Sequence, residues 1–204
     1  MKKYCLALYF LSLWLGYTET FAQQNAKARE ILDKTAATIK NSGGIRATFD
    51  GTQEGTILLE NEKFYLNNGA VETWFDGKTQ WSYVKANEEV NISHPTPEEL
   101  QDTNPYFLVY FYKRGYDYSY GGIKKINGKS GYEILLTPQA PSNITAITLL
   151  IADDYLPFHL RIEAKNQPIQ IIHIRSYRLH QNFNKDTFKC DLKKYPQAET
   201  IDLR

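Results

Sequence analysis

Hydrophobic residues repeat with two different spacings along the chain, and the spacing changes near residue 44. From Ala26 to Lys40 apolar residues recur every three or four positions, which predicts an amphipathic helix. Residues 41–44, Asn-Ser-Gly-Gly, are typical of a helix end. After them Ile45, Ala47 and Phe49 alternate with polar residues, as expected of a strand with one buried face.

Short segments with strand spacing follow one another through most of the remaining chain. Asn67-Asn68-Gly69, Asp76-Gly77 and Asn127-Gly128 separate some of them and supply residues that adopt the positive φ of tight hairpins. No helix alternates with these segments, so we predict a mainly β fold, a single large antiparallel sheet that curls, with two or three helices. The predicted strands after 45–50 are 56–60, 64–67, 70–75, 79–85, 116–120, 122–126, 131–137, 145–152, 158–164, 169–178 and 187–191.

The middle of the chain carries signals for a second helical cover. Thr96-Pro97-Glu98-Glu99 has the spacing of a capping box, and Asn104-Pro105 repeats a helix-start signal. Residues Tyr106 to Tyr112 are all apolar or aromatic, so periodicity alone leaves a buried strand open. A curled open sheet has an apolar concave face that such segments must cover. This cover either completes a solid core or separates to admit a hydrocarbon chain.

The first 22 residues have the pattern of a secretory signal. Lys2 and Lys3 precede an apolar run from Cys5 to Tyr17 that is too short to cross a bilayer. Small residues then lead to a predicted cleavage after Ala22. We therefore expect an exported protein with one folded domain, residues 23–204.

Composition removes several classes of function. The chain has 24 basic and 23 acidic side chains, so it lacks the positive charge that nucleic-acid binding requires. Cleavage of the signal would leave Cys190 as a single cysteine, which excludes a disulfide scaffold and a cysteine-based zinc site. A small buried hydrophobe is the preferred interpretation of Cys190, with an intermolecular disulfide as the alternative.

Catalytic motifs are missing from the sequence. Gly128-Lys129-Ser130 lacks the spacing of a phosphate-binding loop, and no Gly-x-Ser-x-Gly turn is present. No two histidines have the spacing of a helical metal site among His94, His159, His173 and His180. We expect no enzyme, metal or cofactor, although a pair of carboxylates brought together by the fold stays open.

The segment from Trp74 to Tyr83 and several shorter motifs resemble one family, the LolA-like periplasmic carriers of outer-membrane lipoproteins in Gram-negative bacteria. The most distinctive is WFDGKTQWSY at Trp74 to Tyr83, and Gln53-Glu54-Gly55 opens an earlier strand as in the family. Asn104-Pro105-Tyr106-Phe107 is similar to the family's lid helix, and Leu136-Thr137-Pro138 to one of its strand ends. The resemblance implies a divergent member with an open half-barrel of about 10–11 antiparallel strands and a helical lid.

The resemblance also implies a function. Such a monomeric periplasmic carrier takes acylated lipoproteins from an inner-membrane lipoprotein-releasing transporter to an outer-membrane acceptor, without a cofactor. We predict that the acyl chains bind a cavity lined from alternating strand positions by Phe49, Ile57, Leu59, Phe64, Leu66, Trp81 and Tyr83. The predicted lid residues are Ile31, Leu32, Phe107, Leu108 and Phe111.

One segment departs from the family pattern. Better-known carriers have Lys-Arg-Pro shortly before the residue that corresponds to Phe64, and its arginine helps to hold the lid closed. Here that segment is Glu60-Asn61-Glu62-Lys63, so the arginine's role has no counterpart. Two other functions stay open: a lipid-binding or envelope-sensing module without cargo hand-over, and a secreted hydrolase if catalytic side chains converge in a cleft.

Overall fold

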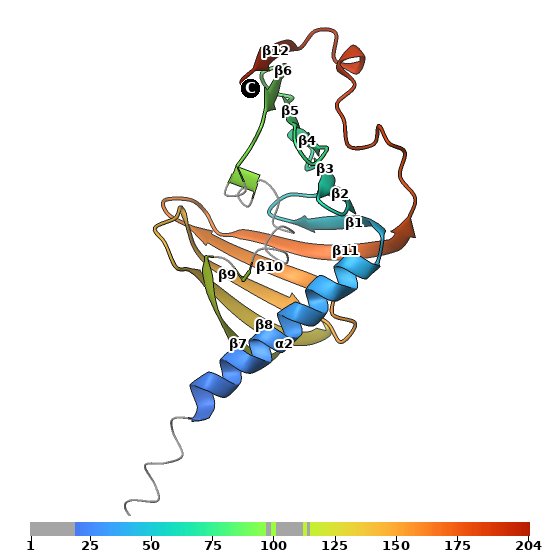
Figure 1. Ribbon diagram of the computed structural model, residues 1–204. Helices are drawn as coiled ribbons and strands as arrows, with labels where there is room; N and C mark the ends of the chain where they lie inside the picture. The colour runs from blue at the N-terminus through green and yellow to red at the C-terminus, as the bar shows by residue number, and fades with distance from the viewer. Residues whose placement is uncertain (1–18, 97–98, 101–111, 114) are drawn as a thin grey trace, which may run out of the picture.

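The computed structural model describes residues 19–96, 99–100, 112–113 and 115–204. These residues form one twelve-stranded sheet and one α-helix, α2 (Glu19–Asn41) (Figure 1). The sheet does not close on itself, because β12 forms one edge and β7 the other. The predicted open curled sheet is therefore confirmed, consistent with a half-barrel.

The predicted number of helices is wrong for the described part of the chain. It contains α2 and one 3₁₀ turn, η2 (Leu192–Lys194), rather than two or three helices. The second predicted cover falls on residues 106–112, of which only Tyr112 lies within the described residues. The capping box before it is confirmed: the Thr96 N–H donates to Glu99 Oε2 and the Glu99 N–H donates to Thr96 Oγ1.

Two antiparallel meanders make up the sheet. The first consists of β1 (Gly44–Gly51), β2 (Gly55–Glu60), β3 (Lys63–Asn67), β4 (Val71–Phe75), β5 (Gln80–Val84) and β6 (Glu89–Ser93). The second consists of β7 (Tyr116–Ile126), β8 (Lys129–Pro138), β9 (Ile144–Ile151), β10 (Pro157–Ala164) and β11 (Gln170–Gln181). Antiparallel pairing of β1 with β11 joins them, and β12 (Glu199–Asp202) pairs in parallel with β6.

Hairpin turns lie where the sequence predicts them. Gly69, Gly77 and Gly128 all have positive φ, between 84° and 100°, which permits the tight connections. The segments predicted as 116–120 and 122–126 form one strand, β7, interrupted by a bulge between Tyr120 and Gly122. Strands β6 and β12 were not predicted.

The strand predicted at 187–191 is wrong. These residues form turns, in which the Thr187 N–H donates to the Asn184 carbonyl and the Lys189 N–H to the Asp186 carbonyl. Burial nevertheless alternates, since Phe188 is 1% exposed and Lys189 is exposed. The period-two pattern therefore arises because alternate side chains of this segment point towards and away from the protein, although the segment is not paired with a strand.

Helix α2 packs diagonally over one face of the sheet, which we call the inner face; the opposite one is the outer face (Figure 1). Ala28, Ile31 and Leu32 are buried against the second meander, and Ile39 is buried against the first. The predicted helix 26–40 is confirmed and extended to Glu19. In the described ranges no helix has the length and hydropathy needed to cross a membrane.

Candidate functional site

An apolar surface runs across the inner face of strands β1 to β4. Directly paired residues on neighbouring strands share a face of the sheet, and Ala47 pairs with Ile57, which pairs with Leu66. In the next row Phe64 pairs with Phe75, and their ring centroids are 5.6 Å apart. Five of the seven predicted cavity residues lie together on this surface: Phe49, Ile57, Leu59, Phe64 and Leu66. We call it the apolar stripe.

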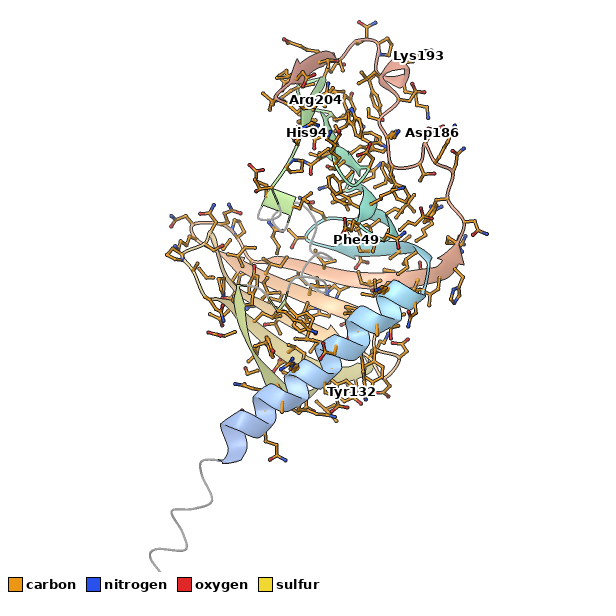
Figure 2. All side chains as sticks on the ribbon, viewed as in Figure 1. Phe49, His94, Tyr132, Asp186, Lys193 and Arg204 are labelled. Atoms are coloured by element: carbon orange, nitrogen blue, oxygen red, sulfur yellow. The ribbon has the colours of Figure 1, made fainter. Side chains whose placement is uncertain are left out.

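Phe49 lies on the inner face of β1, close to the junction of the two meanders (Figure 2). It pairs with Gly55 on one side and Ile174 on the other. A Cβ atom at Gly55 would lie 2.7 Å from Phe49 Cζ and 2.1 Å from the Asn67 carbonyl oxygen. Only glycine leaves room here for the aromatic ring, which explains the Glu54-Gly55 start of the strand.

The lid residues of α2 cover a different part of the inner face. Ile31 and Leu32 are 1% and 0% exposed, and they pack in a cluster with Ile134, Leu149 and other residues of the second meander. Contact between α2 and the apolar stripe runs instead through Ile39. The other three predicted lid residues, Phe107, Leu108 and Phe111, lie outside the described residues.

The predicted place of Trp81 and Tyr83 in the cavity is wrong. Phe75, which lies on the apolar stripe, pairs with Gln80, so the next residue, Trp81, points to the outer face. The same register pairs Trp81 with Trp74 and Tyr83 with Glu72 on that outer face. Alternation along β5 was identified correctly, but the residues that share the inner face with the stripe are Gln80 and Ser82.

A C-terminal segment, residues 183–198, covers these outer aromatic residues, and we call it the strap. Figure 1 shows it running beside the first meander before it reaches β12. The ring centroid of Tyr195 lies 4.3 Å from that of Tyr83 and 5.9 Å from that of Trp74. Burial raises the pKa of the Tyr195 hydroxyl above its ordinary value. The strap therefore makes a second apolar layer that the sequence pattern did not predict.

Cys190 lies in the strap and is partly buried. Burial is the main cause that raises the pKa of its thiol to about 11, and the nearby Asp191 and Glu72 carboxylates add to the effect. A thiol with this pKa is almost wholly protonated at neutral pH, which makes it a poor nucleophile. This environment agrees with the interpretation of Cys190 as a packing residue.

The polarity of the sheet inverts at its far end. On β5 and β6 the outer face carries apolar residues, among them Val90 and Ile92, which are 0% and 5% exposed. The inner face there carries Gln80 and Ser82, and the Gln80 side-chain amide donates to Ser82 Oγ at 3.4 Å. Thr73 Oγ1 on β4 lies 3.5 Å from the same Ser82 oxygen. The apolar stripe thus ends against a polar row.

A polar cluster fixes α2 to Tyr112, the last residue of the predicted lid segment, and to Lys113. Tyr112, 1% exposed, donates its hydroxyl hydrogen bond to Asp33 Oδ1, and Lys113 Nζ lies 2.7 Å from the same oxygen. Arg29 Nε lies 3.8 Å from the other oxygen. The hydrogen bonds from Lys113 and Tyr112 lower the pKa of the Asp33 carboxyl.

Ligands for a metal do not converge in the described part of the chain: no three His, Cys, Asp or Glu side chains meet in a suitable cluster. Sequence reasoning missed a pair, His159 and His173, whose Nδ1 atoms lie 3.1 Å apart across β10 and β11. Burial lowers the pKa of His159, with smaller contributions from His173 and Arg161. Residues 14 positions apart give no local signal for such a contact.

Comparison with solved structures bears on the fold. An uncharacterized conserved protein from Thermus thermophilus has a TM-score of 0.61 at 15% identity, covering 86% of this chain and 99% of that one. Lipoprotein LppX of Mycobacterium tuberculosis has a TM-score of 0.47 at 13% identity, covering 79% and 100%. A putative outer membrane lipoprotein-sorting protein domain from Vibrio parahaemolyticus has a TM-score of 0.43 at 12% identity, covering 82% and 97%. The Thermus similarity shows a shared fold.

Comparison of sequences identifies the family. No curated protein matches the sequence significantly. Residues 18–141 match the family model described as outer membrane lipoprotein carrier protein LolA. The matched range contains α2, the whole apolar stripe and the Trp74–Tyr83 motif. Because this range is more than half of the sequence, the chain belongs to the LolA family of outer membrane lipoprotein carrier proteins.

Proposed function

We propose that this protein binds the acyl chains of lipoproteins on its inner face and carries them through the periplasm from the inner to the outer membrane. The observation that carries the proposal is the apolar inner face of an open sheet, which comprises the apolar stripe and the cluster on the second meander and is covered by an amphipathic helix. Family membership supports the same function. Binding and release break no covalent bond, so the proposal needs neither a catalytic group nor a cofactor.

The energetics explain why such cargo needs a carrier. Burial of one methylene group contributes about 0.8 kcal/mol, so an acyl chain of roughly 14 methylenes gains on the order of 11 kcal/mol on leaving water. A lipoprotein with several chains would leave its membrane extremely slowly without an alternative apolar surface. The inner face supplies that surface, and its release of cargo requires a competing occupant.

Helix α2 has the properties of such a competitor. Its contacts with the sheet are mainly apolar: Ile39 contacts the apolar stripe, and Ala28, Ile31 and Leu32 cover the second meander. Lys34 adds a hydrogen bond of 3.1 Å to the Tyr155 hydroxyl, and Asp33 contributes the cluster with Tyr112. An acyl chain can replace the apolar contacts at little net cost, so small changes in the polar contacts shift the balance between covered and loaded states.

The proposed partners follow from this cycle. Acylated lipoproteins are the cargo, an inner-membrane lipoprotein-releasing transporter would deliver them, and an outer-membrane acceptor would receive them. The carrier would act as a monomer after cleavage following Ala22.

Adjacent positions on opposite faces of the sheet provide a sharp test of the binding surface. Leu66 lies on the apolar stripe, whereas Leu58 on the neighbouring strand faces outward opposite Tyr65. Leu66→Asp should weaken binding of an apolar fluorescent probe by more than about tenfold, because a carboxylate would be buried against hydrocarbon. Leu58→Asp adds the same charge and should leave binding within about twofold.

Circular dichroism and urea unfolding of both variants establish that they are folded. Equal binding by the two variants would show that the stripe is not the binding surface. A hand-over assay then separates the two functions: mature protein purified from the periplasm, with its lipoproteins identified by mass spectrometry, is mixed with outer-membrane vesicles. Transfer of the cargo supports the carrier, whereas binding without transfer supports a lipid-binding or sensing module.

A further inference from the structure

The end of the apolar stripe contains a buried acceptor that has no hydrogen-bond donor among the described residues. Gln80 Oε1 has less than 1 Å² of exposed surface and no hydrogen-bond partner among the described residues. Gln80 pairs directly with Phe75, the last aromatic residue of the stripe, so its side chain lies on the inner face beside the apolar surface. A buried carbonyl without a partner loses its hydration and gains nothing in return.

Neighbouring hydroxyl groups are already engaged with one another. The Gln80 side-chain nitrogen donates to Ser82 Oγ at 3.4 Å, and Ser82 Oγ lies 3.5 Å from Thr73 Oγ1. Thr73 is itself buried, with 4% exposure. The row therefore uses one of the two Gln80 amide hydrogens and one hydroxyl hydrogen internally, and Gln80 Oε1 is its buried acceptor without a partner among the described residues.

The row also contains no charged side chain. A charged head group placed there would lose water without gaining an opposite charge, which is strongly unfavourable in a buried position. A neutral group with an N–H or O–H hydrogen matches the row, because it supplies the missing donor at no such cost. The geometry thus combines a long apolar surface with one neutral acceptor at its end.

We propose that Thr73, Gln80 and Ser82 form a subsite for the neutral polar group of a bound acyl amphiphile, in which Gln80 Oε1 accepts a hydrogen bond from an amide N–H or hydroxyl next to the acyl chain. This inference rests on the proposed function, since the acyl chain must lie on the apolar stripe. It defines the ligand class: an acyl chain whose polar end carries an amide N–H or a free hydroxyl, as at the N-acylated end of a peptide or in a monoglyceride or diglyceride.

Two probes of equal chain length test the subsite. Dodecanamide carries N–H donors, whereas methyl dodecanoate carries none, and both present the same hydrocarbon. Their affinities for the mature protein are measured by displacement of an apolar fluorescent probe. The wild-type protein should prefer dodecanamide by about fivefold or more, the value of one neutral hydrogen bond. Gln80→Leu should abolish this preference while retaining the affinity for methyl dodecanoate.

Gln139→Leu is the matched control, because Gln139 is an exposed glutamine after β8 and far from the row in sequence. It should preserve the preference of the wild-type protein. Equal affinity of the wild-type protein for the two probes, or a preference that survives in Gln80→Leu, would overturn the subsite and leave the proposed function intact. Absence of binding by either probe would overturn both.

Discussion

Tyr112 connects the end of the predicted lid segment to helix α2 through a single hydroxyl group. Its ring is buried beside Tyr118, with centroids 5.7 Å apart, while its hydroxyl donates to Asp33 on the helix. The aspartate lies among Tyr112, Lys113 and Arg29. The cluster therefore ties α2 to the residues just before β7.

Tyr112→Phe removes this hydrogen bond with little change in volume. We expect the free energy of unfolding to fall by about 1–2 kcal/mol at neutral pH, the usual value for a hydrogen bond to a charged acceptor. The pKa of Asp33 is lowered in the folded state from an ordinary 3.8, so its contribution is complete above that pH and is lost as the pH falls through the folded value. The difference between variant and wild type should therefore shrink as the pH falls below 3.8.

Urea unfolding across this pH range measures the effect. Tyr118→Phe is the control, since it removes the same atom from a ring in the same cluster. A loss in Tyr112→Phe that is independent of pH would argue against the charged acceptor.

At the residue scale, the sequence predicted which positions alternate but not always which set lies on the inner face. Phe49 lies on the inner face as expected from its polar neighbours Thr48 and Asp50, and Ile57 and Leu59 share that face although Leu58 on the other face is also apolar. On β5 the larger residues, Trp81 and Tyr83, lie on the outer face, where Tyr83 contacts Tyr195 of the strap. Hydrophobicity alone therefore assigns β5 to the wrong face.

The strap is the element that stabilises the outer face of the first meander. Phe188 is 1% exposed, and its ring centroid lies 5.5 Å from that of Phe183. Tyr195 contacts the far end of the aromatic layer. The strap therefore packs on the face of β4 and β5 opposite the polar row.

Tyr195→Ala tests this role. Truncation of a partly buried ring should lower the free energy of unfolding by about 1–2 kcal/mol and shift tryptophan emission to the red, because water reaches Trp74. Tyr195→Phe keeps the ring and should behave like the wild type. Acyl-probe affinity should be unchanged in both variants, since the inner face is intact. An unshifted emission in Tyr195→Ala would show that the strap does not shield the outer aromatic layer.

Elements with strong local signals were predicted well, and elements that depend on distant partners were not. The hairpins at Gly69, Gly77 and Gly128 have turn residues that require positive φ, which is a local property. Strand β6, Glu-Val-Asn-Ile-Ser, is short and polar on one face, and β12 exists only because β6 offers it an edge. Residues 187–191 have the alternating burial of a strand for the same reason, because a surface distant in sequence determines which of them are buried.

At the scale of the whole molecule, an open sheet has two edges that must avoid pairing with other chains. The β7 edge carries a bulge at Gly121–Gly122 and exposed Lys124 and Lys125, all of which disfavour further pairing. The β6 edge is occupied by β12, where the Glu199 N–H donates to the Glu88 carbonyl and the Leu203 N–H to the Ile92 carbonyl. The bulge and lysines on β7 and the covering of β6 by β12 both support the expected monomer.

Deletion of residues 196–204 leaves Tyr195 in place and uncovers the β6 edge. We expect the shortened protein to self-associate as its concentration rises, because unpaired backbone groups of β6 become available to a second copy. Light scattering after size-exclusion chromatography measures the mass. A chain that lacks only Arg204 retains β12 and should stay monomeric. A monomeric deletion variant at high concentration would show that β12 does not protect the edge.

The pairing of β1 with β11 also determines when folding can finish. Thr48 and Ser176 are 128 positions apart, yet their hydroxyl oxygens lie 2.7 Å from each other across this junction. Each meander is built from local hairpins, which close short loops, whereas the junction closes a loop of most of the chain at a larger cost in entropy. The parallel addition of β12 requires residues still nearer the C-terminus. The twelve-stranded sheet therefore cannot be completed until the residues of both β11 and β12 have been synthesised, although each hairpin can form as soon as its own two strands are present.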